Sequence, residues 1–425
     1  MLIKNASLII TQNKKREILR NKDILIEDGI IAKIGRDLKG NNILDAKNKL
    51  VMPGMINLHT HLPLILLKGV CDNKSLYGWA NKLFPFEKKF SKEDILLGTI
   101  LSCIEMIKSG TTCSVSEYYS SDIIIKAIKS LGIKGFVSET ISDRFSLSGK
   151  IDDAFKTAES LLKEYKNDAL IKPFVMFHSL DTCYLETIYR TKELAEKYNS
   201  LLGTHLMETD KQVKTIKKIY KYDSIETLEK KGILNENLLG IHIGLLTDKE
   251  LNLIKRRNVK LVHCPVSNAK LMNGGFQTAS NVLNKKILLG LGTDSPASNN
   301  SLDLFEEMKS CILIERIRIA GSNTLFKRLI NAQNLLDMVT INAAKILRLN
   351  SGTIEEGKNA DLVLLDIKSS QLHPLINIVS NLVYSCNNSC VSDIICNGKI
   401  IMKEKKILTL DEENIIKKIE KRNPF

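Results

Sequence analysis

Two histidines one residue apart, His59 and His61, end a short apolar run of the sequence, VMPGMINLHTH. In a β-strand, residues i and i+2 lie on the same face, so this spacing places both imidazoles side by side. Imidazole is a common ligand of zinc and similar ions. A pair of this kind can also be an accident of surface composition, and the rest of the chain must decide between the two interpretations.

Most of the other histidines also stand near the ends of short apolar runs. Eight such runs alternate with segments of helical pattern after Met52. The runs are GMINLHTH, GTTCSVSEYY, IKGFVSET, IKPFVMFHS, SLLGTHLME, NLLGIHIG, VKLVHCPV and KILLGLGTDS. The polar residues near their carboxyl ends are His59, His61, Glu117, Glu139, His178, His205, Glu208, His242, His263 and Asp294. Six of the seven histidines of the chain are among them, which neither random placement nor core packing explains.

The order of the runs predicts the fold. Eight strands alternating with helices indicate a (β/α)8 TIM barrel, in which the carboxyl ends of the strands meet at one face and build the active site. The two ends of the chain are richer in short strands and turn signals. We therefore expect an α/β protein with a barrel over residues 53–350. A small β-sandwich domain formed from both chain termini, residues 1–52 and 351–425, is expected beside it.

The barrel would bring further metal ligands to the histidine pair. His205 lies on the fifth run and Asp294 on the eighth. The predicted ligand set is His59, His61, His205 and Asp294. Three imidazoles and one carboxylate, with water at the remaining position, make an open catalytic site for a divalent ion. Glu208 is placed to shuttle a proton, and His242 and Asp294 are placed to hold or deprotonate the water.

The formal net charge of +14 does not by itself indicate a nucleic-acid partner. A basic chain can bind nucleic acid or a membrane surface, or it can carry a lysine-rich solvated surface. Here the lysines are scattered, and runs such as KEKK are short and mixed with acids. We expect neither nucleic acid nor membrane as a partner.

The nine cysteines are an odd number at irregular spacing and do not resemble a disulfide framework. Cys386 and Cys390 lack a second ligand pair at zinc-finger spacing. The N-terminal stretch lacks the architecture of a signal peptide, and no apolar run reaches membrane-spanning length. These features predict a cytoplasmic, soluble protein.

An ordered set of motifs resembles the amidohydrolase superfamily. The motifs are PGMINLHTHLP, THLMET, GLGTDSPASNN and SGTIEEGKNADLVLLD, and they span nearly the whole chain. Within the superfamily the chain is most similar to the 5-methylthioadenosine/S-adenosylhomocysteine deaminases, through GWANKLFPFEKKF, FHSL, HLMET and TDSPASNN. The resemblance implies hydrolytic deamination of a 6-aminopurine nucleoside to the inosine analogue and ammonia. The substrates that the resemblance implies are 5′-methylthioadenosine, adenosine and S-adenosylhomocysteine.

The resemblance also implies roles for single residues. Glu208 corresponds to the acid that protonates purine N1, and His242 to the histidine beside the reacting water. Binuclear relatives place a bridging lysine where this chain has His178, so one divalent ion is expected. Zinc is the expected ion, with iron or nickel as alternatives. The family tends to form homo-oligomers, and the same is expected here.

The substrate-binding residues follow in the same way. His178 corresponds to a histidine that contacts the purine, and Ser298 to a hydroxyl near N7. Glu87 corresponds to a carboxylate that binds the ribose hydroxyls. Trp79, the only tryptophan, corresponds to an aromatic residue near the 5′ substituent, although it can also be a core residue of its helix.

One expected contact departs from the family pattern. Relatives that bind the homocysteine carboxylate use two arginines after the third strand. This chain has Glu139 and, by approximate alignment, Lys150 at those positions, with Arg144 nearby. An acid at position 139 disfavours a carboxylate-bearing substrate, so we expect S-adenosylhomocysteine to be the poorer substrate.

Two alternatives remain open. The first is another deaminase or chlorohydrolase of the same superfamily that acts on a free base or a triazine, such as guanine or cytosine. Glu87 and Trp79 favour a nucleoside over these. The second is a non-catalytic binding protein on the same scaffold. Such a protein would be expected to have lost a metal ligand or the shuttle acid, and none is missing here.

Overall fold

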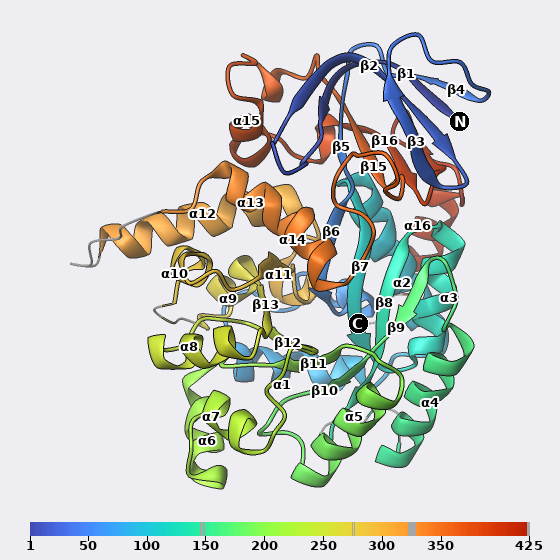
Figure 1. Cartoon of the computed structure of the whole chain (residues 1–425). Helices are drawn as coiled ribbons and strands as arrows, with labels where there is room; N and C mark the ends of the chain where they lie inside the picture. The colour runs from blue at the N-terminus through green and yellow to red at the C-terminus, as the bar shows by residue number, and fades with distance from the viewer. Residues whose placement is uncertain (145–146, 148, 274, 276, 322–328, 423–425) are drawn as a thin grey trace.

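The computed structural model describes residues 1–144, 147, 149–273, 275, 277–321 and 329–422. These residues form two sheets of nine strands each, one parallel and curved into a barrel and one built from both ends of the chain. In Figure 1 the terminal sheet lies above the barrel, and helices surround the barrel strands. Within this described part, no helix combines the length and the apolar character needed to cross a membrane.

The barrel contains the eight predicted strands in chain order. They are β6 (Met55–Thr60), β7 (Thr111–Tyr118), β8 (Lys134–Ile141), β10 (Val175–Phe177), β11 (Leu202–His205), β12 (Leu238–Ile241), β13 (Lys260–His263) and β14 (Leu289–Leu291). Each pairs in parallel with the next, and the short β9 (Ile171–Pro173) extends the pairing of β8. The segment after β14 returns to β6, where the Asp294 backbone N–H donates to the His59 carbonyl at 2.9 Å. The predicted (β/α)8 architecture is therefore confirmed.

Helices and short 3₁₀ turns connect the strands and cover the barrel. Those between the first and fifth strands are η1 (Leu62–Leu67), α1 (Leu76–Glu87), α2 (Lys92–Lys108), α3 (Ser121–Leu131), α4 (Ile151–Glu164) and α5 (Leu185–Lys197). Those between the fifth and eighth strands are α6 (Asp210–Tyr220), α7 (Ser224–Lys230), α8 (Asp248–Arg256), α9 (Pro265–Lys270) and α10 (Ala279–Asn284). After the last strand come α11 (Pro296–Asn299), α12 (Leu304–Ala320), α13 (Ala332–Val339) and α14 (Ile341–Ile346).

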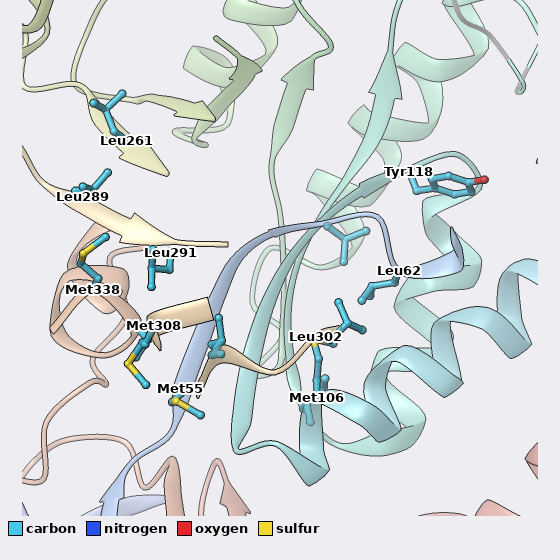
Figure 2. Close-up of a cluster of buried hydrophobic side chains, with 14 of the residues drawn as sticks. Met55, Leu62, Met106, Tyr118, Leu261, Leu289, Leu291, Leu302, Met308 and Met338 are labelled. Atoms are coloured by element: carbon cyan, nitrogen blue, oxygen red, sulfur yellow. The ribbon is translucent and has the colours of Figure 1, made fainter. Parts of the chain in front are cut away.

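Two hydrophobic layers hold the barrel together. One layer fills its interior with side chains such as Leu58, Val115 and Val262, all almost fully buried. The other lies between strands and helices, where α3 presents Ile124 and Ile128 to the sheet. Figure 2 shows part of this layer where η1, α2 and the end of β14 meet, with Leu62, Met106, Leu291 and Leu302 among the labelled side chains. Burial on both faces explains why the strand sequences read as continuous apolar runs.

The terminal sheet joins the two ends of the chain as predicted. Its strands are β1 (Leu2–Ile10), β2 (Ile18–Glu27), β3 (Ile30–Gly35), β4 (Ile43–Asp45), β5 (Lys49–Pro53), β15 (Leu362–Asp366), β16 (Val391–Cys396), β17 (Lys399–Lys403) and β18 (Lys406–Ile407). The order is β18-β17-β16-β15-β5-β1-β2-β3, with β4 beside β1. The antiparallel pair β5–β15 links the two halves. The remaining elements of this part are η2 (Ser370–Leu372), α15 (Ile378–Tyr384), η3 (Asn388–Cys390) and α16 (Glu412–Glu420). The domain limits at residues 52 and 350 stay a prediction.

Candidate metal centre and active site

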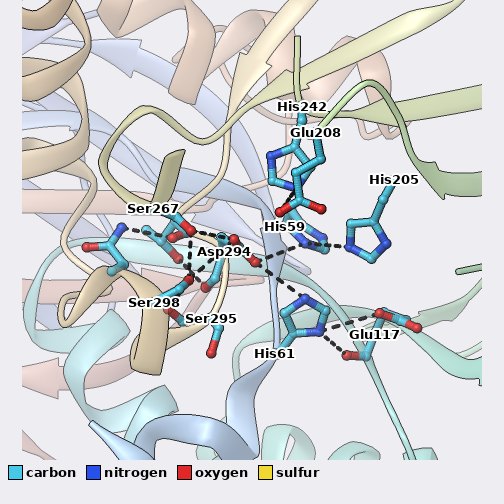
Figure 3. Close-up of polar contacts among 12 residues, drawn as sticks. His59, His61, Glu117, His205, Glu208, His242, Ser267, Asp294, Ser295 and Ser298 are labelled. Carbon is cyan, nitrogen blue, oxygen red and sulfur yellow. Dashed lines mark hydrogen bonds and ion pairs between the residues drawn. The ribbon is translucent and has the colours of Figure 1, made fainter. Parts of the chain in front are cut away.

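The four predicted metal ligands meet at the carboxyl ends of three strands. His59 lies near the end of β6 and His61 directly follows that strand, His205 ends β11, and Asp294 follows β14 (Figure 3). The Asp294 Oδ1 lies 3.4 Å from Nε2 of both His59 and His61, and the Nε2 atoms of His59 and His205 are 3.3 Å apart. His59, His205 and Asp294 are buried, and His61 is half-buried. The strand pattern therefore brings these side chains together as predicted.

Backbone carbonyls determine which imidazole nitrogen faces the centre. The Nδ1 of His61 lies 2.9 Å from the Glu117 carbonyl, and the Nδ1 of His205 lies 2.9 Å from the His178 carbonyl. A carbonyl only accepts hydrogen bonds, so each Nδ1 carries a proton and each Nε2 is directed to the centre. This arrangement orients metal-ligating histidines, because the outer hydrogen bond fixes the tautomer and the ring.

The electrostatics of the cluster suit a cation. Burial lowers the pKa of His59 to about 4, and burial together with the neighbouring imidazoles holds the pKa of His205 well below its usual value. Burial by itself would raise the pKa of Asp294, but its contacts with His59 and His61 hold that pKa well below its usual range. Burial also opposes the charge on His61, yet Asp294 and Glu117 outweigh it and raise the pKa of His61 to about 9. A carboxylate surrounded by imidazoles thus attracts a positive charge.

A second cluster stands beside the first and contains Glu208, His242 and Asp294. The Nδ1 of His242 lies 2.9 Å from the Asn268 side-chain oxygen, so Nδ1 carries a proton and Nε2 faces the site. That Nε2 is 3.7 Å from the Glu208 carboxylate, which accepts a hydrogen bond from Asn273 at 3.0 Å. Burial raises the pKa of Glu208, so this carboxyl keeps its proton more readily than an exposed one.

Left-handed backbone conformations position two of these side chains. His242 has φ of 74° and Asp294 has φ of 62°, values that non-glycine residues rarely adopt. His242 directly follows β12, and Asp294 comes three residues after the end of β14. Strained conformations of this kind persist where the surrounding structure holds them, and they cluster at functional sites.

A cavity of about 290 Å³ opens over both clusters. This volume lies near the lower end of the range of small-molecule sites, roughly 300–1,000 Å³. Helix α1 covers one side and contributes Trp79 and Glu87 to the lining. The Trp79 indole N–H donates to the Ala297 carbonyl at 3.2 Å and so ties α1 to the loop after β14. His178, Glu208 and Ser298 also line the cavity, as predicted for substrate-binding residues.

Three predicted substrate contacts do not reach this cavity. The Glu139 carboxylate accepts hydrogen bonds from the backbone and hydroxyl of Ser121 at the start of α3 and lies outside the lining. Arg144 and Lys150 are exposed and also lie outside it. Side chains alternate along a strand, so Thr140 lines the cavity while Glu139 points toward α3. The expected role of Glu139 in substrate choice has no support in this arrangement.

The sequence reasoning missed several residues that the structure brings to the site. Asn268 and Asn273 hold His242 and Glu208, and Asp181 and Gln212 line the cavity. Asp181 follows His178 by three residues in the loop after β10, so its position at a strand end was a usable signal. The two asparagines lie in and just after α9 and carry no such signal.

Comparisons with known proteins agree over most of the chain. A model of the amidohydrolase family matches residues 50–401. A 5-methylthioadenosine/S-adenosylhomocysteine deaminase of Thermococcus sibiricus is 36% identical over 409 residues, which cover 95% of this chain and 94% of the relative. A 5′-deoxyadenosine deaminase of Methanothrix thermoacetophila is 35% identical over 407 residues, with the same two coverages. An adenosine deaminase structure from Xanthomonas campestris with bound zinc superimposes with a TM-score of 0.93 at 27% identity, covering 99% of this chain and 97% of that one.

Proposed function

The chain belongs to the amidohydrolase family, and we propose that it is a metal-dependent deaminase of 6-aminopurine nucleosides. The proposed reaction replaces the 6-amino group by oxygen from water and releases ammonia. The observation that carries the proposal is the complete set of four ligands, an acid and a base around one cavity. The names of relatives at about 35% identity over nearly the whole chain support the nucleoside class.

The donor set fits one divalent ion. Three imidazoles, which bind a metal in their neutral form, and one ionised carboxylate are ligands that suit zinc, iron and nickel. The ligands are proposed to be His59, His61, His205 and Asp294. Zinc is the proposed ion, in keeping with the zinc named in the Xanthomonas structure. A bound divalent ion lowers the pKa of a coordinated water from 15.7 to about 7, which supplies a nucleophile at neutral pH.

Glu208 and His242 perform the proposed proton transfers. Protonated Glu208 donates to purine N1, which makes C6 more electrophilic. The raised pKa of Glu208 suits this role, because the carboxyl is neutral nearer to physiological pH. The free Nε2 of His242 accepts a proton from the attacking water, and Asn268 keeps the imidazole in the required tautomer. His242 then passes this proton to the 6-amino group, which leaves as ammonia, and the new C6 hydroxyl gives its proton to the ionised Glu208 as the C6 carbonyl forms.

The remaining lining residues hold the nucleoside. His178 and Ser298 are proposed to contact the purine, and Glu87 to accept hydrogen bonds from the ribose hydroxyls. Burial raises the pKa of Glu87, and the neighbouring Tyr118 phenol partly offsets this rise. Trp79 closes the cavity from α1 and offers an apolar surface to the 5′ substituent.

The test is an absorbance assay of the metal-loaded protein with a panel of substrates. The panel contains 5′-deoxyadenosine, 5′-methylthioadenosine, adenosine, S-adenosylhomocysteine, adenine, guanine and cytosine. We expect turnover of the adenine nucleosides with release of one ammonia per product. Turnover restricted to guanine or cytosine would replace the nucleoside assignment by a free-base deaminase. Turnover of none of the seven compounds would contradict the proposal.

A further inference from the structure

The cavity is acidic, and its described lining contains neither lysine nor arginine. Its carboxylates are Glu87, Glu117, Asp181, Glu208 and Asp294. Histidine supplies the only basic side chains of this lining, and three of the four lie in or beside the two ligand clusters. A substrate with a negatively charged substituent would therefore find no lysine or arginine partner in this lining.

Four of the five carboxylates already have a function. Asp294 belongs to the metal centre, and Glu208 is the proposed acid. The Glu117 carboxylate lies 3.4 Å from Nδ1 of His61 and supports that ligand. Glu87 faces the Tyr118 phenol and is proposed to bind ribose. Asp181 is the fifth carboxylate, and the metal centre, the proton transfers and the ribose contact do not use it.

Hydrogen bonds from two side chains hold one oxygen of the Asp181 carboxylate. Its Oδ1 accepts hydrogen bonds from the Ser179 hydroxyl at 2.7 Å and from the Gln212 side chain at 3.2 Å. Gln212 in turn accepts from the Glu208 backbone N–H at 2.8 Å. Across the described residues, Oδ2 has no hydrogen-bond partner. The carboxylate is thus fixed in the cavity wall and keeps one oxygen for a ligand.

The negative charge of Asp181 acts on several parts of the cavity. It contributes to raising the pKa of Tyr77 and of Glu208, after the larger effect of burial in both cases. It also opposes the lowering of the pKa of His178 by burial. These groups belong to α1, to the loop after β10 and to the loop after β11, so the charge reaches across the cavity between them.

Two cations lie near this wall but outside the lining. The Lys211 ammonium stands over the Tyr77 ring, 4.0 Å from its centre, and the Lys211 side chain is exposed. Arg144 is exposed in the segment after β8, and its charge is felt by Tyr220 of α6. Exposed charges are screened by water and salt, and the half-buried Asp181 carboxylate is screened less than they are. Of these three charges, Asp181 is the one that lines the cavity.

Building on the proposed function, we infer that Asp181 is a specificity-determining residue that admits adenine nucleosides with an uncharged or cationic 5′ substituent and rejects anionic ones. A 5′-phosphate would face the unpaired Asp181 oxygen in a site that contains no lysine or arginine among its described lining residues. A 5′-ammonium group would donate to that oxygen. The same charge disfavours the carboxylate of S-adenosylhomocysteine, a preference that the sequence had attributed to Glu139.

The test compares three substrates with wild type and Asp181→Asn. The substrates are 5′-deoxyadenosine, adenosine 5′-monophosphate and 5′-amino-5′-deoxyadenosine, which differ mainly in 5′ charge. Asparagine keeps the shape and an acceptor oxygen for Ser179 and Gln212 while removing the charge. We expect Asp181→Asn to raise kcat/KM for the monophosphate, relative to 5′-deoxyadenosine, by at least tenfold. The relative kcat/KM for the amino substrate should fall several-fold, and the wild-type discrimination should weaken with added salt.

A matched control separates the cavity charge from the overall charge. Asp210 is an exposed carboxylate at the start of α6 and lies outside the lining. Asp210→Asn removes the same charge and should leave the substrate ratios within twofold of wild type. Equal ratios in wild type and Asp181→Asn, or the same change in both variants, would overturn the inference. If wild type turns over no adenine nucleoside, the proposed function fails, and this inference fails with it.

Discussion

At the residue scale, the candidate centre depends on groups that are not themselves ligands. The Glu117 and His178 carbonyls hold the Nδ1 atoms of two imidazoles, and Asn268 does the same for His242. None of these three partners titrates near neutral pH, so the orientation of each ring is independent of the protonation of its partner. The free Nε2 atoms converge as a consequence of strand geometry and these hydrogen bonds together.

Removal of one ligand should remove the metal. We expect wild type to contain about one divalent ion per chain, and His205→Ala to lose most of it, because an open site with three remaining ligands binds far more weakly. Elemental analysis of the purified proteins measures this directly. His263→Ala is the matched control, since His263 also ends a barrel strand, β13, but belongs to neither ligand cluster. Two ions per wild-type chain would contradict the mononuclear site.

The role of Glu208 can be separated from metal binding. Glu208→Gln keeps the shape and the acceptor for Asn273 but cannot donate a proton to N1. General acid catalysis typically contributes about 10²–10⁴-fold, so kcat should fall by at least about 10²-fold. The metal content should stay at the wild-type value. Steady-state kinetics and elemental analysis on the same preparation decide the matter. Loss of the ion would make Glu208 a ligand, and near-normal turnover would remove it from the mechanism.

Strand geometry explains which of the residues predicted from the sequence lie in the site and which do not. His59, His61 and His205 lie on strands whose carboxyl ends must meet in a barrel, so their convergence follows from the fold. Glu139 was expected at the substrate because it aligns with an arginine of the relatives, but side-chain alternation turns it toward α3. Asp181 lies in a loop, where no periodicity predicts the direction of a side chain.

At the element scale, β6 and the segment after β14 approach too closely for any side chain between them. A Cβ atom on Gly292 would lie 2.8 Å from the His59 backbone nitrogen and 2.9 Å from the His59 Cβ. Gly292→Ala should therefore push the His59 strand away from Asp294 and weaken both metal binding and stability. Overpacking of this kind typically costs about 1–3 kcal/mol. Thermal unfolding and metal content report the two effects.

A second glycine provides the comparison for this prediction. Gly321 is the C-cap of α12, and among the described residues a Cβ atom there would meet nothing closer than 3.6 Å. Gly321→Ala should leave the melting temperature and the metal content close to wild type. If Gly292→Ala also retains its metal with full affinity, the two segments have more freedom to separate than the contacts indicate.

Helix α12 carries a buried acid that should make stability depend on pH. Burial raises the pKa of Glu307 to about 8, from 4.5 in an exposed site, although Val266 and Asn299 donate hydrogen bonds to it. The folded state thus binds this proton more tightly than the unfolded state. Its stabilising contribution is complete below pH 4.5 and is lost as the pH rises through about 8.

Glu307→Gln should remove this dependence. The free energy of unfolding of the variant minus that of wild type should increase between pH 6 and pH 8, by up to about 1.4 kcal/mol per pH unit. Urea unfolding at several pH values measures the difference. A difference that stays constant with pH would mean that Glu307 is ionised throughout this range in the folded protein.

The elements themselves were predictable to different degrees. The eight barrel strands are buried on both faces and bounded by helices, so each appears as a distinct apolar run in the sequence. The position of α1 over the cavity was not predictable from its pattern, since it depends on tertiary contacts such as the hydrogen bond from Trp79 to the loop after β14. Its function as a cover rests on those contacts.

At the scale of the whole molecule, the two ends of the chain and the barrel form one connected structure. Similar strand patterns in residues 1–52 and after residue 350 predicted that the termini combine, and the β5–β15 pair confirms it. The strand order within that sheet, with β4 placed beside β1, was not readable from the sequence. Pairing between distant strands depends on the path of the whole chain and carries little local signal.

A buried ion pair joins the barrel to the terminal sheet. Lys134 begins β8, and its ammonium lies 2.5 Å from the Asp361 carboxylate, with both side chains 4% exposed. Asp361 also accepts hydrogen bonds from the Ser351 hydroxyl and from the Asn397 backbone N–H. Removal of one partner of a buried pair leaves an uncompensated charge and typically costs about 3–5 kcal/mol.

Lys134→Met should therefore destabilise the protein by roughly that amount, while kcat at 25 °C stays near wild type because neither residue lines the cavity. Asp361→Asn in the same chain removes the stranded charge but retains an acceptor for Ser351, so the double variant should recover part of the loss. Urea unfolding of wild type, both single variants and the double variant gives the coupling energy, which we expect to exceed about 1 kcal/mol in favour of the pair. Effects that add within about 0.5 kcal/mol would show that the two charges do not depend on each other. The barrel and the terminal sheet would then be held together by their apolar contacts and backbone hydrogen bonds.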